Sequence, residues 1–214
     1  MNREVRYRWS AVAGDRRPGV RKRPLRILAV LVALAGTTAL LGSCGWPGST
    51  PAGPASGGGA RALAPDGAFV TIDGRQSSVA ELRGHPVLLW FVAGGCASCA
   101  VSIPAVAQHL SQLSREGVQV VALGLADDFG PPDQALANLE QFARAAAGPA
   151  FGDRGWTWGM ATESLSRAYD PSGTPDVYFL LTPDGHVWYR NSVPVSTMSD
   201  LLRQAGMLGG RSRG

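Results

Sequence analysis

The chain has 214 residues, and the 153 that follow Arg61 are enough for one packed domain. Its formal net charge of +4 comes from the N-terminus, because residues 1–43 hold nine bases and two acids and the remainder holds eleven bases and fourteen acids, about −3. The basic sequence pI of 9.3 is therefore no sign of a nucleic-acid-binding protein.

Residues 1–43 are predicted to be a lipoprotein signal peptide. Basic residues crowd the start, and an apolar segment from Ile27 to Leu41 follows. It is shorter than the roughly 20 apolar residues of a membrane-spanning helix and fits a secretory signal. It ends in Leu41-Gly42-Ser43-Cys44, which resembles a bacterial lipobox, and this implies that Cys44 is lipidated and becomes the mature N-terminus. An uncleaved anchor is the alternative, and either places the rest outside the cytoplasm.

Residues 44–61 are predicted to be the lipidated cysteine and a flexible linker. From Gly45 to Ala60 the chain is almost entirely Gly, Pro, Ser, Ala and Thr, which cannot bury enough apolar surface to fold. We expect one folded domain over residues 62–208 and a disordered tail over 209–214.

The domain begins with a predicted strand, Ala68 to Ile72, followed by the turn signal Asp73-Gly74. A short helical turn from Ser78 is closed by Gly84. The continuous apolar run from Val87 to Val92 is typical of a central strand that is covered on both faces.

Two cysteines, Cys96 and Cys99, follow this strand through Ala93-Gly94-Gly95 and open a helical pattern. The first N–H groups of a helix lack partners, and its dipole places positive charge there, so Cys96 is predicted to be an exposed nucleophile of low pKa. Cys99 lies one turn further along the same face and is predicted to resolve a mixed disulfide at Cys96. Because Cys44 has another explanation, these two can pair only with each other.

The remaining elements alternate between helices and strands. In chain order, they are a helix after Cys99 that ends at Gly117, a strand over Val118–Leu125, a helix marked by Leu136, Leu139, Phe142 and Ala146, a short helix over Thr162–Tyr169, a hairpin of Val177–Thr182 and Val187–Tyr189, and a helix after Thr197. Trp156 and Trp158 are predicted to pack on an edge strand, with a role in covering the site or binding a partner as the alternative.

This order is similar to the thioredoxin fold, and three stretches resemble its membrane-tethered TlpA and ResA branch. They are Leu82-Arg83-Gly84-His85-Pro86 before the central strand, the C-x-x-C after it, and Gly173-Thr174-Pro175 before the penultimate strand. The resemblance covers most of residues 63–206 and implies an α/β class with a central mixed sheet, flanking helices and an N-terminal β extension. It also implies that Pro175 is cis and that Gly173, Thr174 and Pro175 bind an incoming peptide.

The chain departs from the family at two positions beside the site. Gly95 stands where Trp is common, and Trp90 stands where thioredoxins place a buried Asp that is thought to move the proton of the second cysteine. The proton acceptor for Cys99 must then be water or another carboxylate. Asp176, directly after Pro175, is the nearest candidate, and an ordinary solvated Asp at a strand end is the alternative.

The resemblance implies an extracytoplasmic thiol–disulfide oxidoreductase that exchanges with protein thiols and disulfides. Family analogy slightly favours a reductase in cytochrome c maturation or disulfide repair, with a membrane electron donor or apocytochrome c as partners. No metal, organic cofactor or nucleic acid is implied. The dipeptide Ala97-Ser98 matches neither strongly reducing nor strongly oxidising members, so the direction of electron flow is open.

Four other functions fit the sequence less well. A zinc site needs more ligands, and His85, His109 and His186 show no ligand spacing. A copper chaperone would use the cysteines with His186, which is expected at a hairpin tip away from Cys96. A peroxiredoxin-like peroxidase would need a Pro/Thr-rich loop that Ala93-Gly94-Gly95 does not supply. A redox-inactive binding module would hold a static disulfide, which rarely opens a helix.

Overall fold

A computed structural model describes residues 61–212. The strands are β1 (Ala68–Thr71), β2 (Gln76–Ser78), β3 (Val87–Val92), β4 (Gln119–Gly124), β5 (Trp156–Ala161), β6 (Val177–Leu181) and β7 (Val187–Ser192). The helices are α1 (Ala97–Arg115), α2 (Pro132–Ala147), α3 (Glu163–Tyr169) and α4 (Pro194–Ser212), with 3₁₀ turns η1 (Ala80–Leu82) and η2 (Gly148–Ala150). The predicted signal peptide, Cys44 and nearly all of the linker lie outside the described residues.

Seven strands of the described part of the chain form one mixed sheet in the order β2-β1-β5-β4-β3-β6-β7. β3, β4 and β5 pair in parallel, whereas β6 runs antiparallel to β3 and β7 antiparallel to β6. The β1–β2 hairpin joins the sheet antiparallel to β5 and is the predicted N-terminal β extension. The structure thus confirms the thioredoxin-like α/β class.

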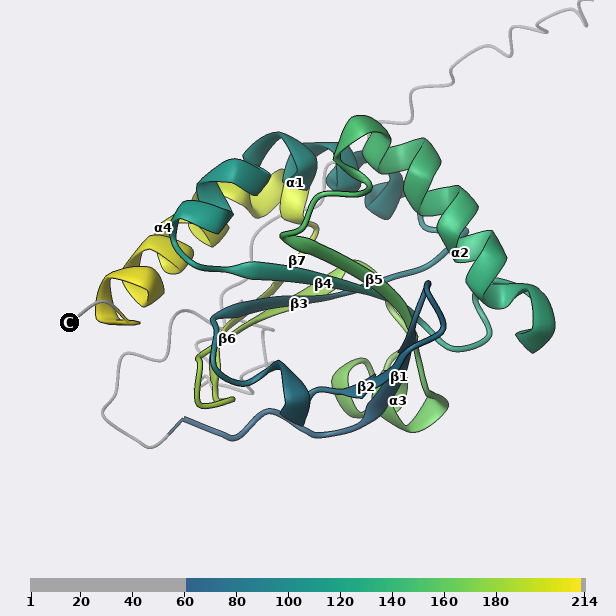
Figure 1. Cartoon of the computed structure of the whole chain (residues 1–214), viewed down its shortest axis with the longest axis horizontal. Helices are drawn as coiled ribbons and strands as arrows, with labels where there is room; N and C mark the ends of the chain where they lie inside the picture. Colours follow the sequence, from purple (N-terminus) through teal and green to yellow (C-terminus); the bar gives the residue numbers. More distant parts are fainter. Residues whose placement is uncertain (1–60, 213–214) are drawn as a thin grey trace, which may run out of the picture. The chain divides into compact units, whose positions relative to one another are not determined.

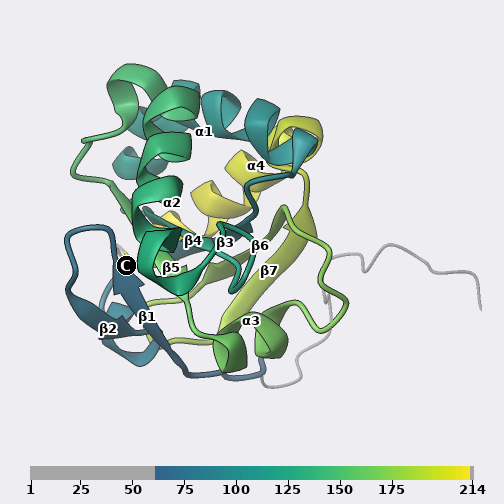
Figure 2. The same cartoon turned by 90° about the vertical axis from the view of Figure 1, so that its right-hand side faces the viewer.

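Helices cover both faces of this sheet. α1, α2 and α4 lie on one face and α3 lies on the other, as the two views in Figures 1 and 2 agree. Every residue of β3 is buried, because alternate side chains of a strand point to opposite faces and both faces are covered. Trp90 packs in the core under α1, α2 and α4, and its neighbour Phe91 packs in the core against α3.

The prediction of an edge strand at Trp156 and Trp158 is wrong. Both lie on β5, which is an interior strand between β4 and β1. Their buried indoles stack with ring centroids 4.8 Å apart. Gly159 lets β1 approach, since an added Cβ would lie 2.7 Å from the carbonyl oxygen of Val70. The local sequence of β5 carries no sign that the N-terminal hairpin returns to cover it.

The prediction of a disordered tail from residue 209 is also wrong as far as Ser212, where α4 ends. Gly209 is buried against the end of α1, and an added Cβ would lie 2.6 Å from the carbonyl oxygen of Glu116. α4 is bent at Thr197 (φ −119°, ψ 16°), so its main part follows Thr197 as predicted. Within the described residues, no helix has the length and apolar character needed to cross a membrane.

Candidate active site

The two cysteines lie where β3 passes into α1. Cys96 is the N-cap of α1, with an extended backbone (φ −84°, ψ 104°), and its sulfur accepts a hydrogen bond of 3.0 Å from the backbone N–H of Cys99. A disulfide joins Cys96 to Cys99, whose Cα atoms are 5.2 Å apart. Cys96 is partly exposed, whereas Cys99 is 0% exposed. A partner can therefore reach the sulfur that lies at the positive end of the helix dipole.

The loop that leads into the cysteines contacts the loop after β4. An added Cβ at Gly94 would lie 3.0 Å from the carbonyl oxygen of Asp128, so any larger residue there would push the two loops apart by a few tenths of an ångström. At Gly95 an added Cβ would meet nothing within 4 Å. The residue before Cys96 is therefore glycine without a steric need, which leaves this side of Cys96 open.

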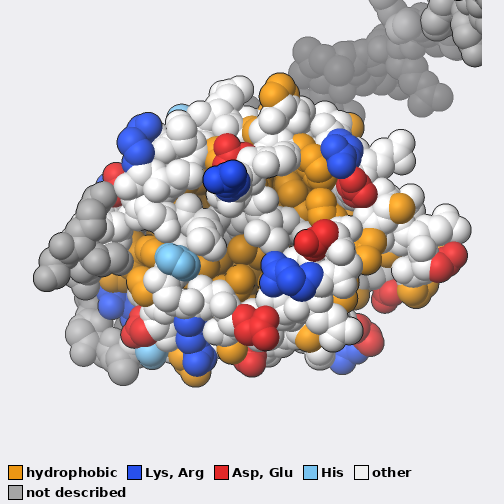
Figure 3. Space-filling model, in the orientation of Figure 1, with side chains coloured by type: hydrophobic (Ala, Val, Ile, Leu, Met, Phe, Trp, Pro, Cys, Tyr) orange, Lys and Arg blue, Asp and Glu red, His pale blue; other side chains and the backbone are white. Residues whose placement is uncertain are grey.

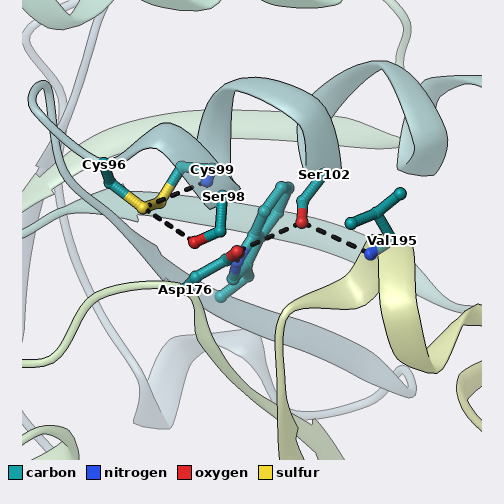
Figure 4. The surroundings of a disulfide bond; sticks show 7 residues. Cys96, Ser98, Cys99, Ser102, Asp176 and Val195 are labelled. Carbon is teal, nitrogen blue, oxygen red and sulfur yellow. Dashed lines mark hydrogen bonds between the residues drawn. A yellow bond between two sulfur atoms is a disulfide. The ribbon is translucent and has the colours of Figure 1, made fainter. Parts of the chain in front are cut away.

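A buried carboxylate lies beside the disulfide. Asp176, directly before β6, is 0% exposed, and one of its oxygens and the two cysteine sulfurs lie within 4.8 Å of one another. The alternative of a solvated Asp at a strand end is therefore wrong. Asp176 accepts a hydrogen bond of 2.9 Å from the Trp90 indole. It accepts another, of 3.1 Å, from the Ser102 hydroxyl (Figure 4).

Burial raises the pKa of Asp176 above its ordinary value, and hydrogen bonds from Ser98, Trp90 and Ser102 oppose that shift in part. The Ser98 hydroxyl oxygen also lies 3.3 Å from the Cys96 sulfur, so its single hydrogen is placed between that sulfur and the carboxylate. Ser98 thus touches both the attackable sulfur and the buried carboxylate (Figure 4).

Trp90 and Ser102 are parts of the site that the sequence analysis missed. Trp90 has the default signature of a core residue in a buried strand, and nothing local shows that its N–H meets Asp176. Ser102 did leave a signal, because it is a polar residue in the buried stripe of α1, next to Ile103 and 0% exposed. Its oxygen also accepts a hydrogen bond of 3.3 Å from the N–H of Val195, which links the site to α4.

The Gly173-Thr174-Pro175 segment leads into Asp176. Thr174 is exposed and Pro175 is partly buried. All peptide bonds in the described residues are trans, so the expected cis bond before Pro175 is wrong. The chain turns instead at Gly173 and Asp176, which have φ angles of 63° and 72°. Asp176 is held in this left-handed conformation, which Asp tolerates better than most residues, by a backbone hydrogen bond of 2.8 Å to Phe91.

The histidines take no part in the site. Among the described residues, the group of potential metal ligands that comes together contains Cys96, Cys99 and Asp176. His186 lies in the β6–β7 turn, at the far end of β6 from Asp176, and its Nδ1 is 3.0 Å from a carboxylate oxygen of Asp184. As expected, His186 is away from Cys96.

The Redoxin family profile matches residues 59–204, which is more than half of the chain. The chain belongs to the Redoxin family. No curated protein matches this redoxin. Its fold is that of several solved structures, all below 25% identity. The thiol:disulfide interchange protein of the thioredoxin family from Chlorobium tepidum TLS is 22% identical, with a TM-score of 0.52, over 72% of this chain and 99% of that one.

Two further structures share this fold. A secreted Mycobacterium tuberculosis disulfide oxidoreductase homologous to E. coli DsbE is 18% identical, with a TM-score of 0.50, over 66% of this redoxin and 95% of that chain. A SCO1/SenC family lipoprotein from Bacillus anthracis is 16% identical, with a TM-score of 0.51, over 67% of this redoxin and 93% of that chain. The fold therefore occurs in proteins of more than one family, so the residues of the site must indicate what this redoxin does.

Proposed function

We propose that this redoxin is an extracytoplasmic thiol–disulfide oxidoreductase that exchanges its Cys96–Cys99 pair with protein thiols and disulfides. One observation carries the proposal. A partly exposed cysteine caps a helix N-terminus and is disulfide-bonded to a fully buried cysteine one turn further on. This arrangement supplies one accessible sulfur and one that only its neighbour can reach.

In the reducing direction, the Cys96 thiolate attacks one sulfur of a partner disulfide. A mixed disulfide forms and the partner's other sulfur leaves as a thiolate. Cys99 then loses its proton and attacks the Cys96 sulfur, so the second partner thiolate leaves and the Cys96–Cys99 disulfide closes. Two electrons pass to the partner, and the reverse sequence oxidises a partner dithiol.

Asp176 is the acceptor for the proton of Cys99 in this scheme. Its carboxylate is close to the buried sulfur. Because burial raises the pKa of Asp176, that pKa is closer to the pKa of a thiol than the pKa of an ordinary carboxylate is. The Cys96 sulfur does not need this acceptor, because the helix N-terminus and the Cys99 N–H stabilise its thiolate.

The partner peptide binds along Gly173, Thr174 and Pro175 in this proposal. The exposed Thr174 and the turn at Gly173 lead directly to Asp176, beside the cysteines. The family resemblance further supports a reductase that draws electrons from a membrane donor and serves apocytochrome c or misoxidised proteins. The cysteine pair itself is the redox group, and the exchange with partners requires no metal or organic cofactor.

Location outside the cytoplasm, with a lipid anchor at Cys44, is part of the same proposal. It is supported by the signal-like residues 1–43 and the lipobox-like Leu41-Gly42-Ser43-Cys44.

Trapping of mixed disulfides tests the exchange. In cells that express the full chain with Cys99→Ser, we expect partner proteins to stay bound through Cys96, because the resolving thiol is absent. Cys96→Ser is the matched control, since it leaves one site cysteine that is buried. The double variant, which keeps Cys44, gives the background. A Cys99→Ser trap no richer than the double variant would contradict exchange and favour a static disulfide.

A further inference from the structure

Three atoms that are suited to bind a metal ion meet at the site. The sulfurs of Cys96 and Cys99 and a carboxylate oxygen of Asp176 lie within 4.8 Å of one another. We propose that the reduced protein binds one zinc ion at these three atoms, and that formation of the disulfide releases it. The proposal goes beyond exchange with partners, because it requires only that a reductant can open the disulfide.

The ligand types select zinc among common cations. Zn²⁺ accepts both thiolate and carboxylate ligands, and sites with three protein ligands keep a fourth position open for water or another group. Copper(I) favours sulfur, whereas Mg²⁺ and Ca²⁺ favour oxygen. Two sulfurs and one carboxylate oxygen therefore suit zinc better than they suit copper(I), Mg²⁺ or Ca²⁺.

The geometry lets an ion enter once the disulfide opens. Reduction removes the S–S bond, so the two sulfurs can move apart, while Asp176 stays fixed by its backbone hydrogen bonds to Phe91 and Val193. Cys96 is partly exposed and gives access from solvent. Each thiol loses its proton when zinc binds, and the two positive charges of zinc offset two of the three negative charges of its ligands.

The surroundings of Asp176 resemble those of a metal ligand. Trp90 donates to one carboxylate oxygen and Ser102 to the other. Ser98 supplies a third hydrogen bond to this carboxylate, and because its two oxygens have four lone pairs in total, one lone pair remains for a metal. Outer hydrogen bonds of this kind orient metal-binding carboxylates. These donors are neutral groups, so zinc would supply a positive charge that they do not.

Zinc titration of the full-length chain tests the proposal under anaerobic conditions against a chromophoric chelator. We expect one tightly bound zinc per reduced chain and none in the oxidised chain. The variant with both Cys96→Ser and Cys99→Ser should bind none, and because it keeps Cys44 it measures any binding there. Equal binding by the oxidised chain or the double variant would overturn the proposal.

The role of Asp176 has its own readout. Asp176→Asn should weaken zinc at least tenfold and leave copper(I) affinity unchanged, because copper(I) needs only the sulfurs. Asp128→Asn is the matched control. Asp128 is exposed and borders the loop that carries Cys96, so its substitution also removes one carboxylate charge but changes no ligand. Equal zinc affinity in wild type and Asp176→Asn, or an equal loss in Asp128→Asn, would overturn the three-ligand site.

Loss of copper(I) binding by Asp176→Asn would show that this variant does not fold. A second variant, Ser102→Ala, then tests the proposal. Ser102→Ala keeps all three ligands and removes one hydrogen bond that orients the carboxylate. Loss of such a bond typically weakens metal binding by roughly 10- to 100-fold. Unchanged zinc affinity in Ser102→Ala would then contradict the proposal, and slower oxidation of the zinc-loaded dithiol than of the metal-free dithiol would support it.

Discussion

Asp176 carries a cost that its neighbours only partly offset. The carboxylate is fully buried, and its hydrogen bonds come from an indole and hydroxyl groups. Burial raises its pKa, so the folded chain holds the proton of this group more tightly than the unfolded chain does. The free energy of unfolding that depends on Asp176 must therefore fall as pH rises.

The predicted fall of the unfolding free energy with rising pH can be measured in the oxidised protein, where neither site cysteine titrates. We expect the contribution of Asp176 to be most favourable below the ordinary Asp pKa of 3.8 and to decline as pH rises through its raised pKa. Asp176→Asn removes this contribution, so the variant should lose less stability than wild type between acid and neutral pH. Urea unfolding across this range measures both, and parallel profiles for the two proteins would contradict the raised pKa.

Among the elements, α1 and α4 are joined at both ends of their contact. Near the site, the Val195 N–H of α4 donates to Ser102 of α1. At the other end, the missing Cβ of Gly209 lets α4 lie against the carbonyl oxygen of Glu116. The helix that carries the cysteines is thus held by a helix that is remote from it in the sequence.

Two neighbouring glycines of α4 make a matched pair for this packing. Gly209→Ala places a Cβ against Glu116 and should cost about 1–3 kcal/mol of unfolding free energy. Gly210→Ala meets nothing within 4 Å and should stabilise the helix by about 0.5–1 kcal/mol. Urea unfolding of both variants measures the difference, and equal effects would show that the α1–α4 contact does not depend on Gly209.

At the scale of the whole molecule, the surface charge and the proposed lipid anchor determine whether the protein associates with a polyanion or with a membrane. Acidic and basic side chains are interspersed on the face shown in Figure 3, so this face offers no broad basic field to a polyanion. The proposed lipid at Cys44 would instead hold the domain at a membrane through the linker. Location would then depend on a single residue outside the folded domain.

Replacing Cys44 tests that anchor. Cys44→Ala should leave the precursor unprocessed or the protein soluble, because the lipid attaches at that sulfur, and globomycin should block processing of the wild type. Membrane fractionation and the mass of the mature N-terminus measure both effects. Unchanged membrane partition of Cys44→Ala would argue for an uncleaved anchor.

The sequence predicts the helices and strands better than it predicts the tertiary contacts between them. Local patterns, such as the apolar run before Cys96, predicted β3, α1 and the position of the cysteines. Long-range pairings, such as the β1–β5 contact and the Trp90 indole against Asp176, leave no local mark. Asp176 could be named as a candidate from its place after Pro175, but its burial depends on strands and helices that meet only in the folded chain.

The pKa of the Cys96 thiol tests the central claim most directly. In a chain with Cys44→Ala and Cys99→Ser, Cys96 is the only one of the three cysteines left, so its alkylation rate against pH reports its thiolate alone. We expect a pKa well below the ordinary value of about 8.5, because the thiolate caps a helix N-terminus. A pKa at or above 8.5 would contradict the assignment of Cys96 as the attacking sulfur.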